Sequence, residues 1–331
     1  MFKPLVSICV SIHNTAQYLP RCLDSLVNQT YTNIEIILVN NGSTDNSEEI
    51  MHHYLNTYHD KIIKIFNQID LGLAQGRQRG VIESSGEYIA FLDADDYFLP
   101  SAIEMLVDRV VECNADIGEI QTTRGKEIIK SKYSNPNAVI SANQYLVSFL
   151  KSGDVPTMLW LRLYKRGLFF PPVFPKAYIN NEDNFALPCI LNNATNICFV
   201  DKPLHVYSTD NDHSFMNEIA IDTKKEKLKK VKISNLLIVK HVGDYLNISN
   251  NSPLKNEFDQ FVFRTIISFL LLDIKMPYRE RKRIINEYFC EYAPKNIELF
   301  LREKATMNCK TNFFIKIFGI RIVIALRGII K

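Results

Sequence analysis

An apolar run that ends in three carboxylates is the feature that most constrains this chain. Residues 88–92 are uncharged and rich in β-forming side chains, and Asp93, Asp95 and Asp96 follow them directly. Such a run predicts a strand buried on both faces of a sheet. Close carboxylates repel one another unless a cation lies between them, so we expect Mg²⁺ or Mn²⁺ and substrate phosphates here. An acidic loop that caps the helix beginning near Pro100 is the structural alternative.

The segments before this run alternate between strand and helix patterns. Apolar strand-like runs lie at 5–12, 34–39 and 62–66, and helix-forming stretches follow over 18–26, from about 46, and over 74–84. This alternation predicts a doubly wound α/β domain with its site above the carboxyl ends of the strands. Neither G-x-G-x-x-G nor a P-loop pattern is present in the sequence, so the residues do not support dinucleotide or P-loop binding.

Composition narrows the class of protein further. The 331 residues are 47% hydrophobic with a formal charge of +3, which suits a globular protein with one large domain and an accessory region, and predicts no nucleic-acid partner. Seven cysteines without a C-x-x-C pair indicate buried thiols in a reducing compartment. The run at 5–12 lacks the flanks of a signal peptide, so we expect a cytoplasmic protein.

Four segments in order resemble the inverting family-2 glycosyltransferases of GT-A fold. They are 6–14, the family's opening strand; 38–45, similar to V-D-D-G-S-T-D; 72–80, similar to G-L-x-x-A-R-N-x-G; and 86–96, similar to G-E-Y-I-A-F-L-D-x-D-D. The resemblance implies transfer of a sugar from a nucleotide sugar to an acceptor hydroxyl. By resemblance, Asp93 would bond the ribose, Asp95 would ligate Mn²⁺ or Mg²⁺, and Arg77 would neutralise phosphate charge. A solvated helix position is the alternative for Arg77.

The same resemblance places further residues around the nucleotide sugar, and some depart from the family pattern. The expected set is Ser11, His13, Asn14, Asn40, Asn41 and Ala94, together with Arg77, Asp93 and Asp95. The family usually has at least one aspartate where this chain has Asn40 and Asn41, although an amide carbonyl can still accept a hydrogen bond from a base N–H. Ser11 and His13 replace the usual proline and tyrosine. His13 is either a wall of the base pocket or a structural histidine.

The acceptor side is expected later in the chain. Residues 158–166 resemble a W-x-x-L-Y-R-R segment, and Trp160 would stack on an acceptor sugar or lie in the core. Residues 180–185 are similar to the family's E-D motif, which makes Asp183 the expected general base and Glu182 an acceptor-binding residue. First-turn acids favoured by the helix dipole are the alternative. His213 is a candidate to complete the metal shell.

The last third of the chain changes character. Residues 195–200 and 203–207 predict a hairpin that closes a catalytic domain over 1–215, and a mostly helical accessory region is expected over 216–331. The tail 312–331 is apolar apart from cations, which divide it too often for a transmembrane span. Wound as a helix it suits a peripheral membrane contact. A buried strand pair or a helix packed on the catalytic domain is the alternative.

Together these features predict a GT-A α/β domain with a C-terminal, mostly helical extension. The expected activity is inverting transfer from a UDP-hexose or UDP-N-acetylhexosamine to a glycan or lipid-linked acceptor in surface polysaccharide, lipopolysaccharide or capsule synthesis. The expected place is the inner face of the cytoplasmic membrane. A catalytically silent, membrane-associated scaffold of the same fold is the alternative, because the acids at Asn40 and Asn41 are lost. A nucleotidyltransferase would resemble G-x-G-T-R-L after the first strand, which this sequence lacks.

Overall fold

The structure is a computed structural model that describes residues 3–176, 179–211, 226–249 and 251–270, together with residues 279 and 283. The chain divides into two compact units, Met1–Phe261 and Val262–Lys331, and the site described below lies in the first. The predicted domain boundary after residue 215 lies outside the described residues and stays a prediction.

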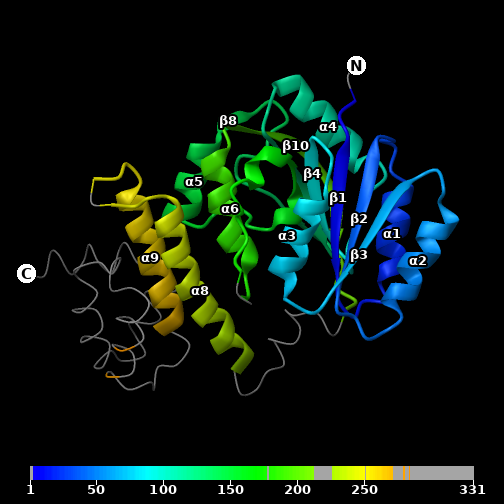
Figure 1. Cartoon of the computed structure of the whole chain (residues 1–331). Coiled ribbons are helices and arrows are strands. Elements are labelled where there is room, and N and C mark those ends of the chain that lie inside the picture. Colours follow the sequence, from blue (N-terminus) through cyan, green and yellow to red (C-terminus); the bar gives the residue numbers. More distant parts are fainter. Residues whose placement is uncertain are drawn as a thin grey trace, which may run out of the picture. The chain divides into compact units, whose positions relative to one another are not determined.

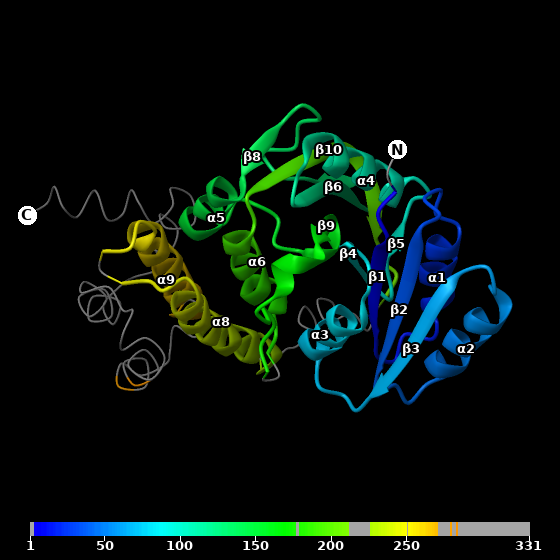
Figure 2. The same cartoon turned by 45° about the horizontal axis from the view of Figure 1, so that its top comes forward.

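The first part of the chain forms four strands and three helices in strict alternation. They are β1 Val6–Ile12, α1 Leu19–Val27, β2 Ile34–Asn41, α2 Ser47–Thr57, β3 Ile62–Gln68, α3 Leu73–Glu83 and β4 Tyr88–Asp93. β1 pairs in parallel with both β2 and β4, and β2 pairs in parallel with β3. Figures 1 and 2 show α1 and α2 on one side of these strands and α3 on the other. The predicted doubly wound α/β arrangement is confirmed.

The remaining elements extend the same sheet and add helices. They are β5 Tyr97–Phe98, α4 Ala102–Cys113, β6 Ile117–Arg124, β7 Glu127–Ile129, β8 Val139–Ser141, α5 Ala142–Lys151, η1 Leu159–Leu161, β9 Arg162–Lys165, η2 Arg166–Phe169, α6 Glu182–Asn193, β10 Asn196–Tyr207, α8 Glu226–Tyr245 and α9 Lys255–Leu270. The strand order is β3-β2-β1-β4-β9-β6-β10-β5. β9 runs antiparallel between β4 and β6. Among the described residues, no helix is both long and apolar enough to cross a membrane.

The predicted hairpin over 195–207 is wrong, because this segment is the single strand β10. β10 pairs in parallel with β6 on both sides of Pro203, and the register shifts between Phe199 and Pro203 and again before His205. Proline has no N–H for the ladder, so within a sheet it is confined to edges and irregular positions. The sequence pattern of two short runs therefore marks a register shift and not a turn.

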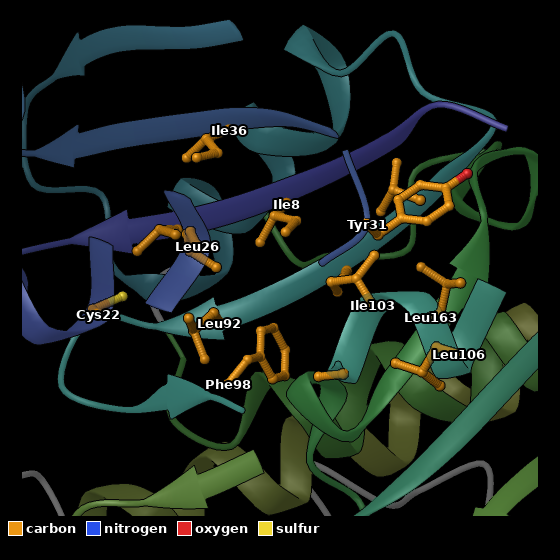
Figure 3. Close-up of a cluster of buried hydrophobic side chains, with 14 of the residues drawn as sticks. Ile8, Cys22, Leu26, Tyr31, Ile36, Leu92, Phe98, Ile103, Leu106 and Leu163 are labelled. Atoms are coloured by element: carbon orange, nitrogen blue, oxygen red, sulfur yellow. The ribbon is translucent and has the colours of Figure 1, made fainter. Parts of the chain in front are cut away.

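Successive side chains of β1 point to opposite faces of the sheet. Val6, Ile8, Val10 and Ile12 join one buried cluster with side chains of α1, α2 and α4, part of which Figure 3 shows. The opposite face packs against α3 at very short range. A Cβ built on Gly76 would lie 2.0 Å from the Ser11 Oγ, so only glycine lets this helix approach the strand. This approach brings the first turns of α3 to the carboxyl end of the sheet.

Candidate active site

One buried guanidinium joins three elements at the carboxyl edge of the sheet. Arg77 of α3 is 3% exposed, and its Nη2 lies 2.8 Å from the Asp93 Oδ1 at the end of β4. Its Nη1 lies 2.5 Å from the Glu182 Oε1 and 2.6 Å from the Asp183 Oδ1, both in the first turn of α6. We call these four residues the Arg77 cluster. It places the end of β4 beside a helix that begins about ninety residues later.

The Arg77 cluster contains three carboxyl groups and one cation. Burial alone would lower the pKa of Arg77, but the charges of Asp183, Asp93 and Glu182 raise it, so the guanidinium stays protonated. Burial raises the pKa of Glu182 to about 7 although Arg77 opposes this shift. Burial also raises the pKa of Asp183, whose carboxylate accepts a hydrogen bond from the Leu159 N–H. A carboxyl group whose pKa lies near neutral pH, as that of Glu182 does, is typical of sites with catalytic acids and bases.

The phosphate-neutralising role that the resemblance implies for Arg77 stays a prediction. In the structure, its hydrogen bonds go to the protein's own carboxylates. The reason is the position of Gly76 and Arg77 on the inner face of α3, which aims the guanidinium between β4 and α6. The solvated alternative for Arg77 is wrong, because the side chain is 3% exposed.

Asp95 and Asp96, which follow β4, are held by the segment 208–211 that follows β10. The Asn211 Nδ2 donates to the Asp95 Oδ2 at 2.8 Å, and the Ser208 N–H donates to the Asp96 Oδ1 at 2.8 Å. Arg21 of α1 donates to the Asp95 carbonyl oxygen at 3.0 Å and to the Ser208 Oγ at 2.7 Å. Its guanidinium also pairs with Asp210 at 2.8 Å. Arg21 therefore holds this segment against residues 94–96, which we call the aspartate loop.

Asp96 and His205 form a buried pair behind the aspartate loop. Burial, with the charges of Asp93 and Asp95, raises the pKa of Asp96 to about 9. Burial lowers the pKa of His205 to about 3, so a neutral carboxyl group faces a neutral imidazole at neutral pH. The Asp96 Oδ2 and the His205 Nε2 lie 3.4 Å apart. On its other side the His205 Nδ1 lies 2.8 Å from the Thr122 Oγ1, which fixes the ring.

Trp160 lies in the core. It is 4% exposed, and its indole stacks on His205 with ring centroids 4.0 Å apart and an interplanar angle of 15°. The expected stacking on an acceptor sugar does not fit this geometry, because the protein's own imidazole covers one face of the indole. Of the two possibilities that the sequence left open for Trp160, the structure has the core position.

Asp95 is the described residue best suited to hold a divalent cation. Within the described residues, no three His, Cys, Asp or Glu side chains are grouped so as to hold a metal ion by themselves. Mg²⁺ at nucleotide sites is commonly bound through one or two carboxylates and the substrate phosphates, and this requires no such group. Asp93 is already paired with Arg77. The Asp95 carboxylate therefore fits the cation, while His213 lies outside the described residues.

The ends of β1, β2 and β3 form the other half of the site, which we call the base-side edge. Its residues are Ser11, His13, Asn14, Asn40, Asn41 and Asp70. The His13 Nδ1 lies 2.9 Å from the Asn41 carbonyl oxygen, and the imidazole itself is exposed. Asn14 has φ 52° and accepts from the Thr44 N–H at 2.7 Å, so it organises the loop after β2. Ser11 lies beside Asp93 in the β1–β4 register, and Ala94 is buried in the turn after Asp93.

Three contributions were not predicted from the sequence. Arg21 holds the segment 208–211, as described above. Arg162 is buried and donates to Glu119 at 2.8 Å and to the Met158 carbonyl oxygen at 2.8 Å, which anchors the segment that carries Leu159. Asp70 contacts Asn41. Arg162 and Asp70 lie within or beside quoted motifs, but only the folded contacts assign them partners.

Comparison with known proteins is consistent with this geometry. Residues 7–167 match the model of glycosyl transferase family 2. The chain is 34% identical over 176 residues to the putative glycosyltransferase EpsH of Bacillus subtilis, covering 51% of this chain and 49% of that protein. The chain spans about half or less of the length of the first curated relatives it matches.

Two solved structures share the fold. The structure of S. aureus TarS 1–349 in complex with UDP-GlcNAc has a TM-score of 0.66 and 17% identity, covering 91% of this chain and 87% of that one. The mannosyltransferase PcManGT from Pyrobaculum calidifontis, in complex with GDP-Man and Mn²⁺, has a TM-score of 0.54 and 13% identity, covering 92% of this chain and 81% of that one. The chain therefore carries a family-2 glycosyltransferase domain of GT-A fold. The family predicted from the four motifs is confirmed.

Proposed function

We propose that this protein is an inverting glycosyltransferase that moves a hexose or N-acetylhexosamine from a UDP-sugar to an acceptor hydroxyl. The observation that carries the proposal is the Arg77 cluster. It holds Asp93, on the donor side, and Asp183, on the acceptor side, against the same guanidinium at 2.8 Å and 2.6 Å. The UDP-GlcNAc bound in the TarS structure supports the choice of donor.

In the proposed reaction the acceptor oxygen attacks the anomeric carbon directly. The new glycosidic bond forms as the bond from the anomeric carbon to the diphosphate oxygen breaks, and the bonding electron pair leaves with UDP. The acceptor proton passes to the Asp183 carboxylate. Burial raises the pKa of Asp183, the charge of Arg77 opposes this rise, and the Leu159 N–H fixes the orientation of the carboxylate. No covalent sugar–enzyme intermediate forms, so an α-linked donor gives a β-linked product.

Asp95 would hold Mn²⁺ or Mg²⁺, which when bound offsets the charge of the departing diphosphate. Asp93 would accept hydrogen bonds from the ribose, and Ser11, Asn14, Asn40 and Ala94 would line the nucleotide site. Glu182 would lie beside the acceptor. The Mn²⁺ in the PcManGT complex supports a divalent cation for this fold.

The proposal is tested by incubating the protein with a panel of UDP- and GDP-sugars and Mn²⁺. Donor binding is measured by calorimetry, and slow donor hydrolysis is followed by release of nucleoside diphosphate. We expect binding and hydrolysis with one or more UDP-sugars. A matched Asp183→Asn variant should retain binding. A protein that binds no nucleotide sugar would instead be the catalytically silent scaffold.

We further propose that the acceptor is a glycan or lipid-linked sugar of a surface polysaccharide, lipopolysaccharide or capsule. The product is made at the inner face of the cytoplasmic membrane. The cationic, apolar sequence 312–331 supports a peripheral membrane contact. Liposome flotation of the full chain and of a chain ending at residue 311 tests this contact. We expect the full chain alone to float with anionic vesicles, and equal behaviour of both proteins would contradict the contact.

A further inference from the structure

The amides that replace the family's aspartates have their carbonyl oxygens occupied. The Asn40 Oδ1 accepts from the Ser43 N–H at 3.0 Å. The Asn41 Oδ1 accepts from the Gln68 Nε2 at 2.7 Å and from the Leu71 N–H at 3.3 Å. An sp² oxygen with two donors has both lone pairs in use. This holds for Asn41. Asn40 has one donor but is only 4% exposed, so an exposed acceptor for a base N–H has to come from another residue.

Asp70, between β3 and α3, offers such an acceptor. Its Oδ1 accepts from the Asn41 Nδ2 at 3.1 Å and from the Gly72 N–H at 2.9 Å. Asp70 is exposed, and its Oδ2 makes no hydrogen bond or ion pair with the described residues. The Asp70 backbone packs closely on Gly42, since a Cβ added to Gly42 would lie 2.6 Å from the Asp70 N. One carboxylate oxygen is thus fixed and the other faces solvent.

Asp45, an acid in the neighbouring loop after β2, already uses both of its carboxylate oxygens. The Asp45 Oδ2 accepts from the Ala16 N–H at 2.9 Å, and its Oδ1 accepts from the Ser47 N–H at 3.1 Å. Both oxygens of Asp45 therefore hold backbone at the start of α2. Asp70 is left as the acid of the base-side edge with an open oxygen.

We infer that Asp70 is the specificity residue for the nucleobase, accepting a hydrogen bond from the N3–H of uracil through its Oδ2. The inference rests on the proposed UDP-sugar donor. His13 and Asp70 both bond to Asn41, the first through the Asn41 carbonyl oxygen and the second through its Nδ2. A base between them would have the exposed imidazole beside it and the carboxylate at its edge.

A single open oxygen also selects among the bases. Uracil presents one N–H donor between two carbonyl groups. Guanine presents two adjacent donors, N1–H and N2–H₂, which a carboxylate matches with two free oxygens. At Asp70 the Oδ1 is held by Asn41 and Gly72, so this second contact is lost. Cytosine presents a ring nitrogen lone pair at N3, which a carboxylate repels. The arrangement therefore favours uracil.

The test measures binding of UDP and of 3-methyl-UDP with Mn²⁺ by calorimetry, because the methyl group removes the N3–H. The variants are Asp70→Asn and the control Asp60→Asn, an exposed aspartate before β3 at the far end of the sheet. The Asn variant keeps a carbonyl oxygen for Gly72. In the wild type and the control, we expect methylation to weaken binding by about 10- to 100-fold, as for a lost hydrogen bond to a charged group. In Asp70→Asn, we expect UDP itself to bind about that much more weakly, with little further loss on methylation.

Three results would overturn the inference. Equal sensitivity to methylation in Asp70→Asn and wild type would remove Asp70 as the reader of N3–H and leave the proposed function intact. A wild type that binds GDP more tightly than UDP would overturn the inference and the UDP-sugar donor of the proposed function, but not sugar transfer itself. A wild type that binds no nucleoside diphosphate would overturn the proposed function and the inference together.

Discussion

The base-side edge is built largely from neutral amides, whereas the Arg77 cluster is built from charges around a buried guanidinium. Asn40 and Asn41 are themselves buried, and His13, Asn14 and Asp70 beside them are exposed. Asn40 and Asn41 are each satisfied by neighbouring loops through neutral hydrogen bonds. In the Arg77 cluster, Asp93, Glu182 and Asp183 all depend on one guanidinium that is 3% exposed. A neutral hydrogen bond contributes only about 0.5–1.5 kcal/mol net, but a buried charge without its partner is strongly destabilising.

This difference explains where the chain departs from its family. Replacing a base-side aspartate by asparagine keeps the shape and an acceptor oxygen, so the fold tolerates Asn40 and Asn41. The same change at Asp93 or Asp183 would leave Arg77 with fewer counter-charges in the interior. Departures from the family pattern therefore gather on the amide-built half of the site, while all four residues of the Arg77 cluster are retained. The predictions below test whether the two halves separate in this way.

The largest effect is expected from loss of the divalent cation. Asp95→Ala, or exhaustive treatment of the wild type with EDTA, should lower the transfer rate by on the order of 10³-fold or more, because diphosphate charge is no longer offset as UDP leaves. The fold should persist, because Asp95 contributes one side-chain hydrogen bond, to Asn211. Steady-state transfer and circular dichroism measure the two effects. Wild-type activity unaffected by EDTA would show that the cation is not needed.

Asp183→Asn should separate chemistry from binding. The amide cannot take the acceptor proton, so kcat should fall by roughly 10²–10⁴-fold, the range for loss of a general base. The donor contacts of the base-side edge are untouched, so UDP binding should change little. Stopped assays give kcat, and calorimetry gives the donor affinity. An α-linked product from an α-linked donor, determined by NMR, would contradict direct displacement by either protein.

The sequence predicted the fold and the members of the site better than their partners. Alternating apolar runs located β1, β2, β3 and β4 to within about two residues, because hydrophobic periodicity is a local property. Motif order placed Arg77 and Asp183 in one site. That a single guanidinium bonds both Asp93 and Glu182 depends on how closely α3 approaches the sheet at Gly76, which no local pattern encodes.

Irregular features were also beyond the sequence. Two short runs around Pro203 resemble a hairpin, yet they form one strand because β6 continues to pair across the register shift. Trp160 could equally have been a sugar platform or core, and only the stack on His205 decides between them. The contacts of Arg21 and Asp70 join residues that are distant in sequence or that lie in loops. Such contacts follow from tertiary structure and produce no periodic pattern in the sequence.

Arg77→Met should destabilise the protein strongly. The substitution keeps a long, helix-compatible side chain but removes the buried cation that Asp93, Glu182 and Asp183 share. Loss of one partner of a buried ion pair costs about 3–5 kcal/mol of unfolding free energy. Arg79→Met is the matched control on the same helix, since Arg79 forms a partly exposed pair with Glu83 at 2.8 Å. That change should cost about 0.5 kcal/mol. Urea unfolding at pH 7 measures both, and equal losses would contradict the cluster's role.

The smallest of the expected effects is a pH dependence from Glu182. Burial raises its folded-state pKa to about 7, above the ordinary value of 4.5, so the folded protein binds the proton more tightly than the unfolded chain. Its contribution to stability is fully present below the unfolded pKa and is lost as the pH rises through about 7. Unfolding free energy should therefore fall between pH 5 and pH 8, by on the order of 1–3 kcal/mol for this group.

Glu182→Gln isolates that contribution, because it removes the titrating group and keeps the shape of the side chain. The raised pKa of Asp96 gives a fall of the same sign, but it is present in both proteins and cancels in the difference. Glu49→Gln is the control, since Glu49 is an exposed acid in the first turn of α2, as Glu182 is a buried one in the first turn of α6. Denaturant unfolding at four pH values should give a flatter profile for Glu182→Gln alone. A Glu182→Gln profile as steep as the wild type would mean that the proton of the Arg77 cluster resides on another carboxyl group.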